Sequence, residues 1–248
     1  MNIVAIIQAR MGSTRLPGKV MKEVLGKPLL ELQIERVRKS KLINRVVVAT
    51  TKKETEQPII DLCKRLSVDY FRGSEMDVLA RYFEAAIQYK ADVVVRLTAD
   101  DPLIDPTIID KIIAEFLSNP SKYDYVSNSI VKTYPLGLDT EVFSINALKQ
   151  AYWEAKNPAY REHVTPYIHL HPDKFNIGVV LHPVDLSSYR LTVDTEADLE
   201  LISRVLEELY IKKRECFTLE DIIVLLQQHP EWLLLNSHIE QKKLEDEL

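Results

Sequence analysis

The sequence predicts an α/β fold of three layers, in which helices cover both faces of a mostly parallel sheet. Two observations predict it. Short apolar runs rich in β-branched residues occupy residues 3–7, 46–49 and 93–95, as in strands that are buried on both faces. Segments with helical spacing of apolar residues lie between these runs. Such alternation favours right-handed crossovers and a doubly wound sheet, with ligands at the carboxyl ends of the strands.

Length and composition indicate a globular protein of one domain with an elaboration, and no independent second domain. Of the 248 residues, 46% are hydrophobic and 28% are charged. The net charge of −5 argues against a general nucleic-acid binder. We expect a cytoplasmic protein with no membrane partner, because no charged leader precedes the first strand and no apolar run is long enough to span a bilayer. Cys63 and Cys216 match no disulfide or metal spacing.

The first predicted strand ends in a basic loop, residues 8–19, with the sequence QARMGSTRLPGK. Gly12 and Gly18 permit close approach of the backbone to a ligand, and Ser13 and Thr14 offer hydroxyl groups. Positive charge for phosphate oxygens comes from Arg10, Arg15 and Lys19. The loop differs from the Walker A and dinucleotide-binding patterns. By itself it indicates a triphosphate site, with a solvated surface turn as the alternative.

Three helices are predicted from their first residues and their apolar faces. One begins near Pro28. A second follows Ser74 and Asp77, which form a plausible capping box. A third opens at Asp105 and Pro106.

Two adjacent acids, Asp100 and Asp101, follow the strand that continues to residue 97. They lie at the same predicted edge of the sheet as the basic loop. Paired carboxylates at this edge are a candidate site for a divalent metal. Because Asp before Pro also commonly starts a turn, a purely structural role is the alternative.

The middle third, residues 123–171, loses the simple alternation. A strand is expected at residues 124–127, and residues 138–143 alternate so that Asp139 and Glu141 share one face. That face is either the solvent-exposed side of a half-exposed strand or the base of a pocket that binds the acceptor.

Arg161 and His163 follow in an ionisable segment ahead of an aromatic run. Arg161 is a candidate for contact with an anionic substrate. His163 could be a general base, although a structural role is the more common one for a histidine in such a pattern. A further strand is expected at residues 175–181.

Another strand is predicted at residues 190–193, before a long amphipathic helix. Thr195 and Asp198 form a capping box for that helix. Asp194 lies just outside the capping box, where it could meet Asp100 across the sheet.

The tail contains one more predicted helix at residues 219–228 and an apolar group at residues 232–235. Such a group usually packs on its own domain, and contact with a partner subunit is the alternative.

Five segments together resemble a known family. R-x-G-S-T-R-L-P-G-K at residues 10–19 is similar to the nucleotide-binding signature of the sugar cytidylyltransferases. Residues 94–104, 134–139, 161–167 and 192–195 look in order like the SpsF-type branch of that superfamily, associated with spore-coat and surface polysaccharide synthesis. The resemblance extends to about residue 210 and leaves the tail uncovered.

The resemblance implies a GT-A-like nucleotide-diphospho-sugar transferase fold. A nucleotidyltransferase domain would span residues 1–210, with a central insert at about residues 128–175, and residues 211–248 would form a helical C-terminal extension. The reaction that the resemblance implies is magnesium-dependent transfer of a nucleotidyl group, expected from CTP to a sugar or sugar acid, with release of pyrophosphate. Relatives also pair subunits through the central region, so a homodimer is plausible.

The resemblance also implies roles for particular residues. The expected Mg²⁺ ligands are Asp100 and Asp194. The expected catalytic residues are Arg15, Lys19 and Asp100. The expected nucleotide-binding residues are Ala9, Arg10, Met11, Gly12, Ser13, Arg15, Lys19, Arg72, Ser74, Thr98 and Asp100. Together with the pattern in the middle third, the expected substrate-binding residues are Asp139, Glu141 and Arg161.

Two positions depart from the family pattern. Ala99 and Asp101 stand where the octulosonate enzymes have Gly and Glu, and Thr192 stands where the sialate enzymes tend to have Asp. The second departure removes a possible metal ligand. Two alternative functions remain open at this level: a glycosyltransferase of the same fold that consumes a nucleotide sugar, and a non-catalytic protein that keeps the fold.

Overall fold

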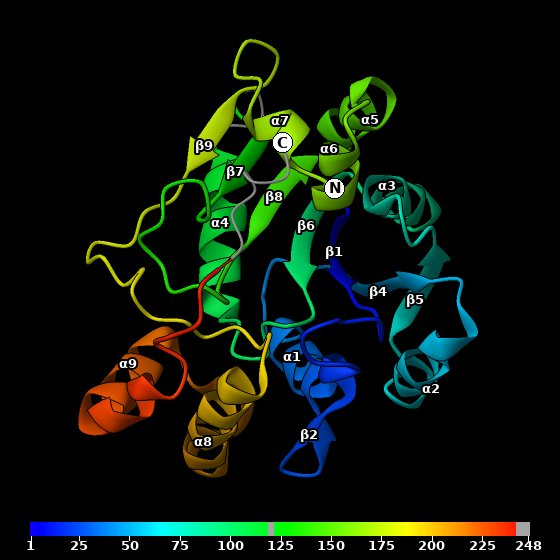
Figure 1. Ribbon diagram of the computed structural model, residues 1–248. Helices are drawn as coiled ribbons and strands as arrows, with labels where there is room; N and C mark the ends of the chain where they lie inside the picture. The colour runs from blue at the N-terminus through cyan, green and yellow to red at the C-terminus, as the bar shows by residue number, and fades with distance from the viewer. Residues whose placement is uncertain (119–121, 242–248) are drawn as a thin grey trace.

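A computed structural model describes residues 1–118 and 122–241 and contains a seven-stranded sheet. Its strand order is β5-β4-β1-β6-β8-β7-β9. The bounds are β1 (Ile3–Gln8), β4 (Arg45–Thr51), β5 (Asp69–Gly73), β6 (Val93–Thr98), β7 (Tyr125–Ser127), β8 (Glu141–Ser144) and β9 (Ile177–Val179). The strand pairs of this sheet in the described residues are parallel except those that β8 makes with β6 and β7. The predicted α/β class and mostly parallel sheet are therefore confirmed (Figure 1).

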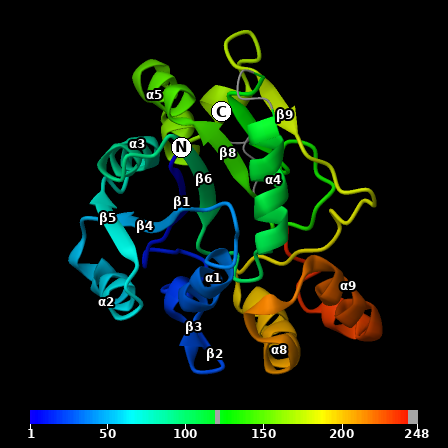
Figure 2. The ribbon, with the colours of Figure 1, turned by 180° about the vertical axis from the view of Figure 1, so that it is seen from behind.

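Helices cover both faces of the sheet because the strand side chains alternate between two apolar clusters. Ala5 and Ile7 of β1 join the cluster that contains α1 (Leu29–Val37), α2 (Gln57–Arg65) and α4 (Pro106–Ser118). Val4 and Ile6 join the opposite cluster. That second cluster contains α3 (Val78–Gln88), α5 (Ile145–Glu154), α6 (Pro158–His163) and α7 (Pro166–His169). Figure 2 shows α4 in front of the sheet when it is seen from behind.

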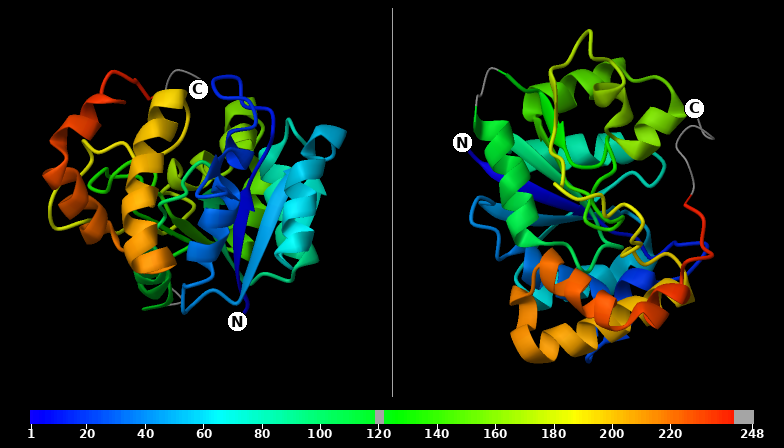
Figure 3. Two further views of the ribbon diagram at one scale, coloured as in Figure 1. Left: turned by 90° about the horizontal axis from the view of Figure 1, so that it is seen from below. Right: turned by 90° about the vertical axis from the view of Figure 1, so that its left-hand side faces the viewer.

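The C-terminal third adds a helical pair beside α1. It consists of α8 (Glu196–Lys213) and α9 (Leu219–Gln228), which lie side by side in Figures 1 and 3. A third apolar cluster joins their buried leucines, isoleucines and valines to Leu29 and Leu32 of α1. Trp232 and Leu235 pack against the same cluster. The prediction that the apolar tail packs on its own chain is confirmed.

Short elements complete the chain. The hairpin strands are β2 (Glu23–Val24) and β3 (Lys27–Pro28), and the 3-10 helices are η1 (Lys19–Met21), η2 (Glu54–Glu56), η3 (Arg214–Cys216) and η4 (Pro230–Leu234). Residues 128–175, expected to form an insert, contain β8, which lies between β6 and β7 in the main sheet. The expected extension from residue 211 contains the end of α8, then α9 and η4, and its residues 242–248 lie outside the described part of the chain. No helix among the described residues is long and apolar enough to cross a membrane.

Three local predictions were wrong. Asp77, and not Ser74, caps α3, because the Asp77 side chain accepts the Ala80 amide while Ser74 accepts the Asp77 amide. The strand expected at residues 138–143 begins only at Glu141, and Glu141 is buried and does not face solvent. Residues 190–193 form no strand, because their pairing is limited to a single bridge between Leu136 and Arg190.

Candidate functional site

A cavity of about 430 Å³ opens at the carboxyl ends of β1 and β6. This is the edge of a parallel sheet at which ligands of α/β proteins bind. Its lining consists of Gln8, Ala9, Arg10, Ser13, Thr14, Arg15, Lys19, Val20, Val78, Arg81, Arg96, Thr98, Ala99, Asp100, Glu162, His163, Asp194 and Gln241. The cavity therefore joins the basic loop to both acids that the sequence singled out.

The basic loop is folded by its own backbone. The carbonyl of Met11 accepts hydrogen bonds from the amides of Ser13 and Gly18, each at 3.0 Å. Gly18 has a φ of 66°, a left-handed conformation that glycine adopts without strain. Leu16 is buried in the cluster beneath α8 and anchors the turn. As a result Lys19 starts η1 with its side chain directed toward the two acids.

Lys19 lies between the two acids and bonds to both. Its Nζ donates to Asp100 Oδ2 at 2.9 Å and to Asp194 Oδ1 at 2.8 Å. It also donates to the Val193 carbonyl at 2.8 Å. Burial by itself lowers the pKa of Lys19, but the charges of Asp100 and Asp194 outweigh it and raise the pKa above its ordinary value. Conversely, burial raises the pKa of Asp100, and the Lys19 ammonium more than offsets this and lowers it.

Two arginines share the other carboxylate oxygen of Asp194. Arg15 Nη2 lies 2.9 Å and Arg190 Nη2 lies 3.1 Å from Asp194 Oδ2. Arg190 is in turn bound by Asp198, the capping residue of α8, through Nε at 2.8 Å. Asp194 is thus held by three cations, of which Lys19 is shared with Asp100 and Arg190 with the fully buried Asp198.

The pair Asp100 and Asp194 suits a divalent cation that is shared with a phosphate ligand. Mg²⁺ is commonly held by one or two carboxylates together with substrate phosphates and water. One cation, the Lys19 ammonium, already bridges one oxygen of each acid. Within residues 1–118 and 122–241, no group of three His, Cys, Asp or Glu side chains could hold a metal by itself. The donor set therefore fits a metal that arrives with a nucleotide better than a permanently bound one.

A second, smaller hollow of about 210 Å³ adjoins the cavity. Asp139, Tyr134, Ser188 and Arg190 contribute to its lining, and Gln241 borders both spaces. Burial, with the negative charge of Glu141, raises the pKa of Asp139 to about 6. Its lining of hydroxyl, amide and charged groups can form hydrogen bonds with a polyhydroxylated molecule.

The structure brings about half of the predicted site residues to the cavity. Those that line it are Ala9, Arg10, Ser13, Arg15, Lys19, Thr98, Asp100 and Asp194. Those outside its lining are Met11, Gly12, Arg72, Ser74, Asp139, Glu141 and Arg161. Of the second set, Asp139 faces the adjoining hollow.

Local bonding explains the positions of the others. Arg72 donates from Nη2 to the carbonyls of Lys52 at 2.7 Å and Lys53 at 3.0 Å. Arg161 pairs with Asp77 through Nε at 2.8 Å and also binds two backbone carbonyls. Glu141 pairs with Arg96 and accepts the Tyr125 hydroxyl at 2.6 Å. These charged side chains are therefore bound by other groups of the protein.

Several lining residues were not singled out by the sequence. Arg81 and Arg96 are the main examples, because both line the cavity and the Nε of each is buried without a hydrogen-bond partner among the described residues. Gln8 likewise presents an unpaired Oε1. Buried polar atoms normally have partners, so these three indicate contacts to a ligand. Only the periodicity of β6 and α3, which places both arginines on the same face of the sheet, could have indicated them.

Glu162 and His163 also line the cavity, next to Arg161, which does not. The helix that carries them, α6, ends at Val164, a fully buried residue with a φ of 75°. A positive φ is unusual for a β-branched side chain, so its surroundings hold it in place. The sequence offered no sign of this turn.

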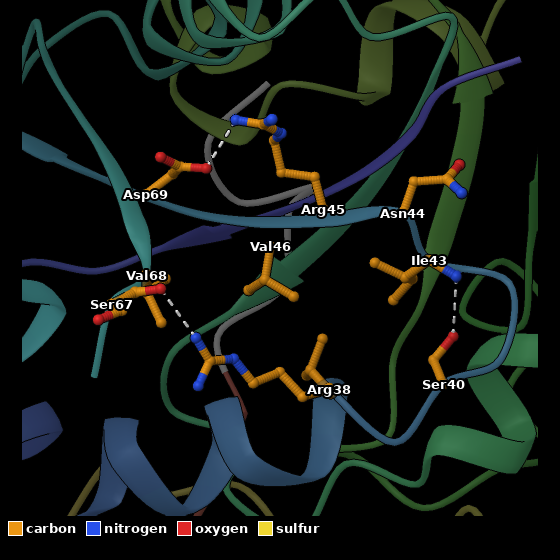
Figure 4. Close-up of a pocket in the computed structure, with 10 residues that line it drawn as sticks. Arg38, Ser40, Ile43, Asn44, Arg45, Val46, Ser67, Val68 and Asp69 are labelled. Carbon is orange, nitrogen blue, oxygen red and sulfur yellow. Dashed lines mark hydrogen bonds and ion pairs between the residues drawn. The ribbon is translucent and has the colours of Figure 1, made fainter.

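Another hollow, of about 360 Å³, lies at the opposite end of the sheet, where β4 and β5 begin (Figure 4). Its cations already have partners. Arg38 donates to the carbonyls of Leu66 and Ser67, and Arg45 pairs with Asp69 at 2.8 Å. The grouping of basic loop and acids therefore marks the first cavity as the candidate site.

Comparisons with known proteins agree with this geometry. A family model described as cytidylyltransferase matches residues 4–239. An uncharacterized protein of Methanocaldococcus jannaschii is 40% identical over 98% of this chain and 97% of its own length. The spore coat polysaccharide biosynthesis protein SpsF of Bacillus subtilis is 35% identical over 93% of this chain and 96% of its own.

A solved structure of a cytidylyltransferase from Leptospira borgpetersenii superposes on this chain with a TM-score of 0.90 at 34% identity. The superposition covers 98% of this chain and 100% of the Leptospira chain. The GT-A-like nucleotidyltransferase fold is thereby confirmed. The match also extends through the tail, which the resemblance in the sequence had left uncovered.

Proposed function

Because this chain belongs to the cytidylyltransferase family, we propose that it is a magnesium-dependent enzyme that activates a sugar or sugar acid with CTP. An acceptor oxygen attacks the α-phosphorus, the bond from that phosphorus to the bridging oxygen breaks, and pyrophosphate leaves. The observation that carries the proposal is the bridge of Lys19 between Asp100 and Asp194 at the mouth of a basic cavity.

The basic loop is proposed to bind the triphosphate. Ser13, Arg15 and Lys19 line the cavity together with Arg10, so three positive charges and a hydroxyl face one ligand. Phosphoryl-type transfer depends chiefly on alignment and on neutralisation of charge. Arg15 and Lys19 would stabilise the charge that grows on the departing pyrophosphate.

Asp100 and Asp194 are proposed to hold Mg²⁺ against the α-phosphate. When bound, the metal neutralises phosphate charge and orients the reacting oxygens. The contribution of this chain is to fix the two carboxylates, and Thr98 at the end of β6 helps by donating to the neighbouring Asp101 at 2.7 Å. Lys19 would then be released from the carboxylates to contact a phosphate oxygen.

The acceptor is proposed to lie toward Asp139, in the smaller hollow beside Asp194. Asp139 and Ser188 can bind hydroxyl groups of a sugar, and the hollow borders Arg190, which touches Asp194. Glu141 would contribute indirectly, through Arg96, which lines the cavity, whereas Arg161 is paired with Asp77, which lines neither hollow. By analogy with SpsF, the product would serve the synthesis of a surface polysaccharide.

A thermal-shift screen with ATP, CTP, GTP and UTP, with and without Mg²⁺, tests the nucleotide. A ligand that binds only the native state raises the melting temperature. We expect the largest rise with CTP and Mg²⁺ together. Pyrophosphate release is then assayed with sugar acids and sugar phosphates as acceptors. Absence of a CTP shift and of pyrophosphate release with every acceptor would contradict the proposal.

Two further expectations stay predictions. A homodimer is tested by size-exclusion chromatography with light scattering, and a cytoplasmic location is tested by cell fractionation.

A further inference from the structure

We propose that Asn236, in the C-terminal segment, is a positioning residue for Asp194 and acts through Asp198 and Arg190. The segment after η4 would then help to orient a residue of the site, in addition to packing on α8. The inference rests on the proposed function, in which Asp194 binds a divalent metal. It assigns a role to a residue that lies outside the cavity and that contacts neither the basic loop nor the side chains of Asp100 and Asp194.

Asp198 is the centre of the arrangement. It is fully buried, and its Oδ2 accepts the amides of Asp194 at 3.1 Å and Thr195 at 3.0 Å. Its Oδ1 accepts Arg190 Nε at 2.8 Å. Asp198 therefore fixes Asp194 in two ways, through the Asp194 backbone and through the arginine that touches the Asp194 side chain.

Asn236 bonds to both Asp198 and Arg190. It is 3% exposed, and its Nδ2 donates to Asp198 Oδ1 at 2.9 Å and to the Arg190 carbonyl at 3.1 Å. A capping box needs only the bonds on Oδ2 and the Thr195 hydroxyl. The contacts of Asn236 on the Oδ1 side are therefore additional to helix capping, and they orient Arg190 by both its backbone and its partner.

Arg190 determines which oxygen of Asp194 remains available. It contacts Oδ2 at 3.1 Å, whereas Oδ1 faces Lys19 and, across it, Asp100. Lys19 and Arg15 can turn toward phosphates when a nucleotide binds. Arg190 stays, because a fully buried acid holds its Nε, and so keeps Oδ1 directed toward Asp100.

The test measures Mn²⁺ affinity by electron paramagnetic resonance, with and without CTP, on wild type, Asn236→Asp and Asn236→Ala. Asn236→Asp keeps the size of the side chain but replaces its donor. Loss of a residue that orients a metal ligand typically weakens metal affinity by about 10-fold to 100-fold. We expect a rise in the Mn²⁺ dissociation constant of at least about 10-fold in both variants. Ser237→Ala, an exposed change in the same segment, is the matched control and should leave it unchanged.

A purely structural role gives a different result. It lowers the melting temperature of the variants but leaves the Mn²⁺ dissociation constant of the folded protein unchanged, and this result would overturn the inference. Should neither Asn236 variant fold, Asn236→Ser carries the same test, because its single hydroxyl cannot make both bonds that the Asn236 Nδ2 makes to Asp198 and to the Arg190 carbonyl. Wild type that binds neither Mn²⁺ nor CTP would instead contradict the proposed function.

Discussion

Lys19 Nζ lies 2.8 Å from Asp194 Oδ1, although 175 residues separate the two in the chain. The contact joins the loop after the first strand to the start of α8, and Asp100 meets the same ammonium from the end of β6. A single cation therefore links three distant segments. Its removal is the most direct test of the site.

Lys19→Met should lower turnover in pyrophosphate release by about 100-fold or more, since loss of one group that stabilises developing charge costs this much in other enzymes. Lys22→Met is the matched control, because Lys22 pairs with the exposed Glu196 at 2.9 Å and does not line the cavity. Steady-state rates of both variants with CTP, Mg²⁺ and the acceptor decide the matter. Equal rates in the two variants would contradict the assignment.

Arg10 and Arg72 should respond differently to substitution by alanine. Arg10 is exposed in the cavity, so Arg10→Ala should weaken CTP binding by about 10-fold, the loss of one charge-assisted bond. Arg72 binds backbone carbonyls after β4, so Arg72→Ala should lower stability by about 1–3 kcal/mol with little change in CTP affinity. Calorimetric titration with CTP and urea unfolding separate the two. The reverse pattern would restore Arg72 as a base-binding residue.

Asp139→Asn should stabilise the protein at neutral pH. The pKa of Asp139 is raised to about 6 by burial and by Glu141, so the folded state binds more protons than the unfolded state between about pH 4 and pH 6. The free energy of unfolding of the wild type therefore falls as pH rises through this window. That of the variant does not fall for this reason, because Asn does not titrate. The difference should grow to at most about 3 kcal/mol at pH 7 and vanish below about pH 4. Urea unfolding without metal at several pH values measures it, and a difference independent of pH would contradict this account.

Gly137→Ala should destabilise the protein by about 3 kcal/mol or more and weaken nucleotide binding with it. Gly137 has a φ of 102°, and an added Cβ would lie 2.5 Å from the Leu191 carbonyl carbon. The clash pushes away the segment that leads to Asp194. Gly26→Ala, at a φ of 71° with open space around the Cβ, should cost only about 1 kcal/mol. Similar losses in the two variants would mean that the close approach at Gly137 does not matter.

Much of the fold could be predicted because its signals are local. The apolar runs at β1, β4 and β6 are recognisable wherever they occur, and the cap Thr195 with Asp198 begins α8 as expected. Chirality then orders strands joined by helices. The segment around residue 190 was predicted wrongly because its apolar alternation serves packing against α8, and its pairing is limited to one bridge between Arg190 and Leu136.

The sequence by itself determined the family, the sheet and the edge where the basic loop and the acids gather, because each follows from short-range patterns. The tertiary structure alone decided which charges face the cavity. Arg72 and Arg161 are bound by carbonyls and by Asp77 outside the cavity lining, whereas Arg81 and Arg96, the partner of Glu141, line it. The physical reason is that a charge is neutralised by whichever group the fold brings within about 3 Å, and that group can lie anywhere in the chain.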